Sequence, residues 1–163
     1  MPSEDNKLLE VLNGEDELGA VIRAHIHIEA RINKLIESNI RVPKHLGKLD
    51  LEYHQKVKLA IACGLNSDFE SPLNTLGTLR NNFAHKLDTS LSVNEVQSLY
   101  NSFKGIDKQI IQGAYQRTKK KMSIKGPKSV TKLEPKEQFI LIVISLDAAL
   151  QSETKRLSNE SCA

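Results

Sequence analysis

The sequence predicts an all-α fold, an up-and-down bundle of about five to six helices. Apolar residues recur at steps of three and four in successive segments, the period of a half-buried helix. Glycine, proline and capping residues stand at several boundaries between these segments, where they end or begin helices. No internal repeat divides the 163 residues, so a single domain over residues 1–163 is expected.

The chain begins with a short helix predicted over residues 4–13, which Gly14 ends. A long helix is predicted over residues 16–40, and the core of the bundle over residues 15–157. The long helix carries one apolar stripe, formed by Leu18, Val21, Ile22, Ile28, Ile32, Leu35 and Ile36. We expect this stripe to face the centre of the bundle.

The next predicted helix runs from near Asp50 to Cys63, where Gly64 supplies the left-handed conformation that ends many helices. Ser71 is then predicted as the N-cap of a helix over residues 72–88, with Pro72 as its first residue. Its apolar stripe consists of Leu73, Leu76, Leu79, Phe83 and Leu87.

Ser92 and Glu95 form a capping box, because the side chain of each can bond the backbone N–H of the other. This box predicts a helix, and a further helix continues or follows after Gly105. Residues 122–134 are predicted to form a flexible basic loop, since they include Gly126 and Pro127.

The last helix is predicted from Pro135 to about Leu157, with a frayed tail over residues 158–163. Its run Phe139–Ile144 is apolar on every side and rich in β-branched residues, which alone would also suit a strand. The apolar pattern continues at helical spacing beyond the run, so a central buried helix is predicted instead.

Composition excludes several classes of protein. Hydrophobic residues make up 39% of the chain and charged residues 26%, as in ordinary globular proteins. The run Phe139–Ile144 is too short to span a bilayer, so no membrane association is expected. The two cysteines, Cys63 and Cys162, form no Cys-x-x-Cys pair, which favours a reducing, cytoplasmic setting over a disulfide framework or a zinc site.

The net charge of +3 hides an uneven distribution. Residues 117–132 carry +7 without any acid, so the remainder of the chain sums to −4. Such a segment attracts phosphate or an acidic partner, although it also suits a solvated loop. The candidate contacts to an RNA backbone are Lys119, Lys120, Lys121, Lys125 and Lys128.

The segment Arg80–His85 is the strongest candidate for a functional site. Arg80 and His85 lie about 140° apart on an ideal helix, whereas Asn81 and His85 share a face. A two-fold dimer with this helix on its axis would bring two arginines and two histidines into one cleft.

These residue types suit RNA cleavage without a metal. Arg80 can hold a phosphate by two parallel hydrogen bonds, and Asn81 can orient it. The imidazole of His85 can transfer the proton as the ribose 2′-OH attacks phosphorus, which leaves a 2′,3′-cyclic phosphate. DNA lacks the 2′-OH, so it is excluded as a substrate. The alternative to a catalytic role is that these residues form an ordinary polar face of a helix.

His25 and Glu29 lie four residues apart on the edge of the long helix's stripe, where they could support Arg80 or His85. A half-buried pair without a catalytic role is the other interpretation. His25 and His27 are about 200° apart on a helix and cannot chelate one metal ion. No metal and no cofactor are expected.

The Arg80–His85 segment resembles the Arg-x4-6-His signature of the HEPN superfamily, which prefers a polar residue directly after the arginine. The helical order over residues 15–157 is similar to that of the mannitol-operon-repressor branch. The segments that carry this likeness are Ile28–Ile32, Lys56–Leu65 and Leu91–Val96.

The resemblance implies a dimeric helical bundle with Arg80 and His85 as the catalytic pair and Asn81 in support. Many HEPN proteins are metal-independent ribonucleases of toxin–antitoxin or antiviral systems, so RNA and an antitoxin or regulatory protein are the implied partners. The branch paired with nucleotidyltransferase antitoxins carries Tyr where this chain has Leu87. The repressor-like branch acts through protein contacts, so a non-enzymatic transcriptional regulator is the alternative.

Overall fold

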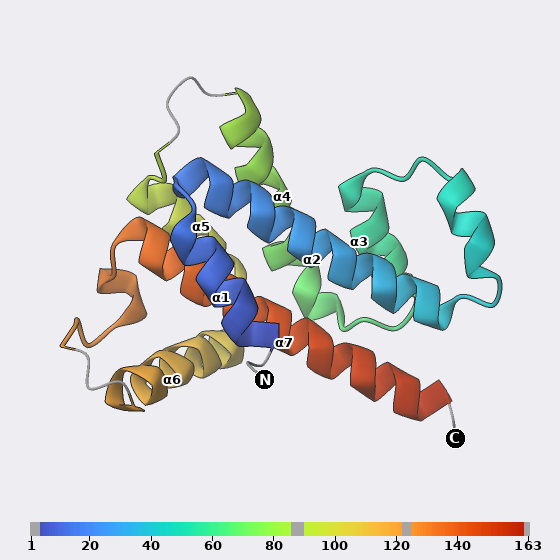
Figure 1. Ribbon diagram of the computed structural model, residues 1–163. Coiled ribbons are helices and arrows are strands. Elements are labelled where there is room, and N and C mark those ends of the chain that lie inside the picture. The colour runs from blue at the N-terminus through green and yellow to red at the C-terminus, as the bar shows by residue number, and fades with distance from the viewer. Residues whose placement is uncertain (1–3, 86–89, 122–124, 162–163) are drawn as a thin grey trace.

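The protein is an all-α bundle, as the sequence predicts (Figure 1). The computed structural model describes residues 4–85, 90–121 and 125–161. Within these ranges there is no strand, and the seven α-helices exceed the five to six expected. The α-helices are α1 Glu4–Gly14, α2 Glu17–Asn39, α3 Tyr53–Ala62, α4 Glu70–His85, α5 Val93–Ser102, α6 Gly105–Lys121 and α7 Pro135–Ser161. Three 3₁₀ turns join them, η1 Pro43–Lys48, η2 Ser67–Phe69 and η3 Val130–Lys132.

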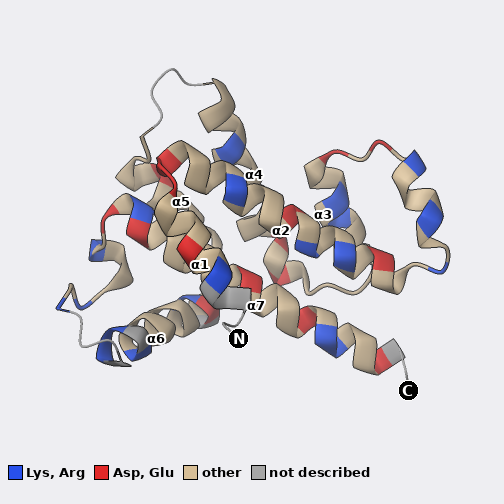
Figure 2. Ribbon diagram, viewed as in Figure 1, with Lys and Arg blue, Asp and Glu red and all other residues tan. Residues whose placement is uncertain are grey.

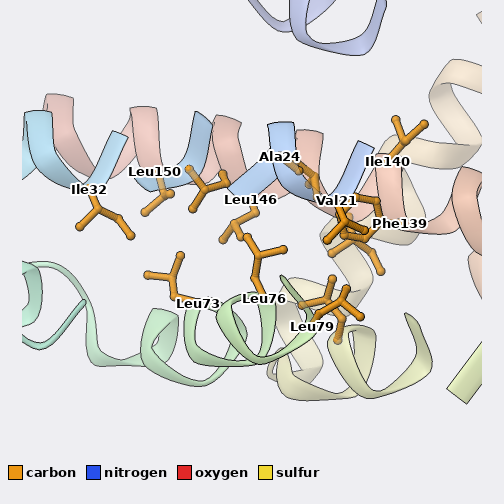
Figure 3. Close-up of a cluster of buried hydrophobic side chains, with 14 of the residues drawn as sticks. Val21, Ala24, Ile32, Leu73, Leu76, Leu79, Phe139, Ile140, Leu146 and Leu150 are labelled. Atoms are coloured by element: carbon orange, nitrogen blue, oxygen red, sulfur yellow. The ribbon is translucent and has the colours of Figure 1, made fainter. Parts of the chain in front are cut away.

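The core lies where α2, α4 and α7 meet, and Figure 3 looks into it. The side chains of α4 that Figure 3 labels point toward those of α2 and α7. Those labelled are Val21, Ala24 and Ile32 of α2, Leu73, Leu76 and Leu79 of α4, and Phe139, Ile140, Leu146 and Leu150 of α7. All are at most 4% exposed, so the apolar stripes found in the sequence face one shared interior.

The two longest helices, α2 and α7, run side by side in the same direction (Figure 1). Lys136, at the start of α7, donates to the backbone carbonyl of Glu15 just before α2. Further along α7, Asp147 contacts His27 and Arg31 in the middle of α2. Helix directions therefore do not simply alternate along the chain.

Helix α4 begins earlier than the sequence suggests. It starts at Glu70, directly after η2, so Ser71 lies inside the helix and is not its N-cap. Pro72 still falls in the first turn, where its missing N–H leaves no hydrogen bond unmade. The capping box of Ser92 and Glu95 is confirmed at the start of α5, and α6 begins at Gly105.

Residues 122–124 of the predicted basic loop lie outside the described residues, and the rest of the loop is anchored to α6. Within residues 125–134, Val130 is fully buried and its N–H donates to Oε1 of Gln112 in α6. Nε2 of Gln112 in turn donates to the carbonyl of Lys128. At the other end of α7, the helix continues to Ser161, beyond the predicted end at Leu157.

A buried carboxylate links α7 to α2. Asp147 is 1% exposed and accepts hydrogen bonds from Nε of Arg31 at 2.7 Å and from Nε2 of Gln151 at 2.9 Å. Nε2 of His27 lies 3.0 Å from its Oδ1. Burial raises the pKa of Asp147, but the bonds from His27 and Arg31 outweigh burial and bring the pKa to about 2.

This low pKa predicts a loss of stability in acid. The folded-state pKa lies below the unfolded value near 3.9, so the full contribution of Asp147 is present above about pH 4. We expect about 2 kcal/mol of unfolding free energy to disappear as the pH falls from 4 to 2. Urea unfolding at several pH values would measure it. The slope in this window should be smaller in an Asp147→Asn variant, where only carboxylates such as Glu153 still contribute, and an unchanged slope would contradict the assignment.

Within the described residues, no helix is long and apolar enough to cross a bilayer.

Candidate functional site

A solvent-open cleft of about 750 Å³ lies between α2, α3 and α4. Helix α2 contributes His25 and Glu29, and α4 contributes Arg80 and Asn81. Its other lining residues are Leu51, Glu52, Tyr53, His54, Lys58, Asn74, Gly77 and Thr78. We call it the Arg80 cleft. The structure thus brings together four residues that the sequence singles out from two distant segments.

The cleft depends on a close approach between α3 and α4 at Gly77. A Cβ atom at this position would lie 2.8 Å from Cδ1 and Cε1 of Tyr53, closer than carbon atoms pack. The absence of a side chain therefore lets the phenol ring of Tyr53 lie against the backbone of α4. The hydroxyl of Tyr53 donates to the carbonyl of Leu73 at 3.0 Å, which fixes the ring.

Tyr53 and His25 form the wall of the cleft. Their ring centroids are 4.3 Å apart and the rings are tilted by 44°. Burial raises the pKa of Tyr53, and the carboxylate of Glu29 raises it further, so the phenol stays protonated as a donor. Neither Tyr53 nor Gly77 stands out in the sequence as a candidate site residue. A glycine inside an amphipathic helix was the signal available for this close contact.

His25 is held as a neutral imidazole. Burial lowers its pKa, Glu29 partly offsets this, and the positive charges of Arg80 and Lys56 lower the pKa again. Nδ1 of His25 lies 3.9 Å from Oε2 of Glu29, whose Oε1 accepts a 2.6 Å hydrogen bond from Nζ of Lys56. Because the unperturbed value is 6.5, the lowered pKa leaves His25 uncharged at pH 7 and able to accept a proton.

Arg80 is one of two cations that line the cleft, the other being Lys58. Its side chain is exposed, and Nη1 donates to Oδ1 of Asn81 at 3.0 Å. In the part of the chain that the structure describes, Arg80 has no carboxylate partner. The guanidinium is therefore oriented by an amide but not neutralised, which suits it to binding an anion.

His85 does not line the Arg80 cleft. It is exposed at the C-terminal end of α4. Five residues of helix separate it from Arg80 by about 7.5 Å along the axis and about 140° around it. The single chain therefore places His25, and not His85, beside Arg80. Leu87 lies outside the described residues.

The candidate lysines occupy another side of the molecule. Figure 1 shows the C-terminal ends of α4 and α6 well apart, and Figure 2 shows the basic residues at that end of α6. Nζ of Lys119 donates to the carbonyl of Pro127 at 3.0 Å, so it ties down its own loop. Lys120, Lys125 and Lys128 are exposed near it, and the side chain of Lys121 lies outside the described part. Of the candidate lysines between residues 119 and 128, none whose side chain is described lines the Arg80 cleft.

Among the described residues, no group of three or more His, Cys, Asp or Glu side chains is placed to hold a metal ion. His25 and His27 point to opposite flanks of α2, the first into the Arg80 cleft and the second to Asp147. Comparison with protein-family models, curated proteins and solved structures gave no match.

The close packing at Gly77 predicts that an alanine at this position in α4 lowers the free energy of unfolding. Replacing a glycine inside a helix by alanine normally stabilises it by about 1 kcal/mol. At Gly77 the new methyl group would collide with Tyr53, so we expect Gly77→Ala to cost about 1–3 kcal/mol instead. Gly113→Ala in α6 is the matched control, because its Cβ would meet only the tip of Arg117 at 3.4 Å. Equal stabilisation by both changes in urea unfolding would disprove the contact.

Proposed function

We propose that the protein is a metal-independent endoribonuclease in which Arg80 holds the scissile phosphate. The observation that carries the proposal is the unneutralised guanidinium of Arg80 in a solvent-open cleft, beside the neutral imidazole of His25. A fixed cation and a titratable group are the minimum that RNA cleavage requires when no metal takes part.

In the proposed reaction the ribose 2′-oxygen attacks the adjacent phosphorus. An imidazole accepts the 2′-OH proton, the bond from phosphorus to the 5′-oxygen breaks, and that oxygen receives a proton. The products are a 2′,3′-cyclic phosphate and a 5′-hydroxyl. Arg80 binds the non-bridging oxygens through two N–H groups, and its charge stabilises the negative charge that builds on them. Asn81 keeps the guanidinium in place.

Two histidines are available for the proton transfers. His85 is the group that the sequence resemblance implies, and it would reach the phosphate in a homodimer whose two α4 helices face each other. His25 lies in the Arg80 cleft of one chain and is uncharged at neutral pH, as a proton acceptor must be. Cleavage by single-histidine variants separates the two roles.

The test is RNA cleavage in EDTA by purified protein. We expect Arg80→Ala to reduce the rate about 10²–10³-fold, because an electrostatic contact to the transition state is lost. His85→Ala and His25→Ala show which imidazole transfers the proton. Arg41→Ala and His45→Ala are matched controls, since both residues are exposed outside the cleft. Intact RNA at high protein concentration, or equal cleavage by Arg80→Ala, would refute the enzyme.

A second candidate is a non-enzymatic regulator that acts through protein contacts. The observation that favours it is the position of His85 outside the cleft that Arg80 lines. Sedimentation analysis helps to decide between the two. A dimer that dissociates on an Ala84→Arg change at the exposed end of α4 supports the nuclease with His85 at the interface. A monomer at micromolar concentration excludes the dimer-dependent role of His85. In that case either His25 transfers the proton in the nuclease, or the protein is the regulator.

A further inference from the structure

A second concave surface lies on the other flank of α2, where α1 packs beside it. This groove has a volume of about 600 Å³ and is lined only by residues of α1 and α2. Its apolar part includes Val11, which is 40% exposed, and Ile26, which is 60% exposed. Ala30 lies one helical turn beyond Ile26 on the same face and is also exposed. We call it the α1–α2 groove. Val11, Ile26 and Ala30 lie outside the buried core, whereas Leu8, which also lines the groove, belongs to it.

The lining of the α1–α2 groove contains cations but no carboxylate. Lys7 on α1 and Lys34 on α2 are exposed, and neither has a carboxylate partner among the described residues. Beyond Lys34 the surface continues into a hollow of about 460 Å³ against α7, which adds Lys155 and again no acid. Lys7, Lys34 and Lys155 therefore supply the positive charge at the border of the apolar part, because the charge of Arg23 is paired with Glu15.

The buried carboxylate of Asp147 fixes the edge of this surface. It holds Nε of Arg31 at 2.7 Å and Nε2 of His27 at 3.0 Å, and both residues line the groove. Their side chains are ordered before anything binds, so a ligand would not have to immobilise them. The geometry points to a preformed docking surface.

We propose that the α1–α2 groove docks an acidic amphipathic helix of a partner protein. The stretch of α2 from Arg23 to Lys34 is about 16 Å long, which matches a helix of about three turns. Leucine-type side chains at every third and fourth position would cover Val11 and Ile26, and flanking carboxylates would meet Lys7 and Lys34. RNA would use the cations but leave Ile26 uncovered, so the exposed apolar side chains favour a protein helix over RNA.

The probe is a fluorescein-labelled peptide of about 15 residues, which forms about four helical turns. It carries a leucine stripe on one face and glutamates elsewhere. Anisotropy titrations are run with the full chain. We expect the peptide's affinity to weaken with salt. It should fall at least about tenfold for Ile26→Glu, which removes an apolar contact, and for Lys34→Glu, which repels the peptide's glutamates. Circular dichroism checks that each variant folds, which the exposure of both residues leads us to expect.

The matched controls are Val93→Glu and Lys44→Glu, which make the same changes at exposed positions outside the groove and should bind the peptide normally. Replacing the peptide's glutamates by lysines, or its leucines by serines, should abolish binding. Equal binding of acidic and basic peptides, or no binding, would overturn the proposal. Loss of oligouridylate binding in Lys34→Glu, with peptide binding unchanged, would assign the surface to RNA instead. RNA cleavage by groove variants should be unaltered, so this result is independent of the proposed nuclease.

Discussion

Replacement of Asp147 by Asn is expected to lower the free energy of unfolding by about 3–5 kcal/mol. The carboxylate is 1% exposed and accepts hydrogen bonds from Arg31 and Gln151, with His27 alongside. An asparagine fits the space, but its neutral amide removes the charge that Asp147 contributes to its contact with the guanidinium of Arg31. Its NH₂ group would also face other donors. The cost thus comes from the loss of this buried ion pair and from the donors that face each other.

Urea unfolding of Asp147→Asn measures this cost, and Glu160→Gln supplies the control. Glu160 also accepts hydrogen bonds from an arginine, Arg156, but on the exposed surface near the end of α7. Solvent screens that pair, so we expect little change from Glu160→Gln. Similar midpoints for wild type and Asp147→Asn would mean that the Asp147 cluster does not stabilise the junction of α2 and α7.

The second large effect is expected for Phe139→Ala, at about 3–5 kcal/mol of unfolding free energy. Phe139 is fully buried near the start of α7, in the core that this helix shares with α2 and α4 (Figure 3). Truncation would remove the packing contacts of the phenyl ring and leave a cavity in the core that its neighbours cannot fill.

The control for Phe139 is Leu141→Ala, two residues further along the same apolar run. Leu141 is only partly buried, because the helix turns it away from the centre. We expect it to cost less than half as much as Phe139→Ala in thermal or urea unfolding. Equal losses at the two positions would indicate an environment that is uniform around α7, contrary to the one-sided core of the structure.

The helices were predictable because their signals are local. The stripe of α2, the capping box of Ser92 and Glu95, and the position of Pro135 each lie within a few residues of the element that they define. The prediction was wrong at the start of α4, where Ser71 looks like an N-cap. The turn η2 before it already has helical geometry at its end, so the helix begins at Glu70. Local chemistry permitted both starts.

The candidate site was predictable only in part. Arg80, Asn81, His25 and Glu29 were singled out from the sequence and do line one cleft. The sequence did not indicate that Tyr53 and Gly77 would form its wall, although helical spacing already set His85 about 140° away from Arg80. The lysines of residues 119–128 looked like an RNA contact, yet Lys119 is bound to its own loop. The number of charged residues in a segment does not determine where their side chains lie in the folded protein.

Helical content and the apolar stripes followed from the amino-acid order alone, since hydrophobic spacing and caps act over one or two turns. Which polar side chains meet was decided by the tertiary structure. Asp147 and His27 are 120 residues apart in the chain, and Lys56 and Glu29 are 27 apart. Such contacts form only when α2, α3, α4 and α7 pack through their apolar faces, and no local pattern records the resulting angle between those faces.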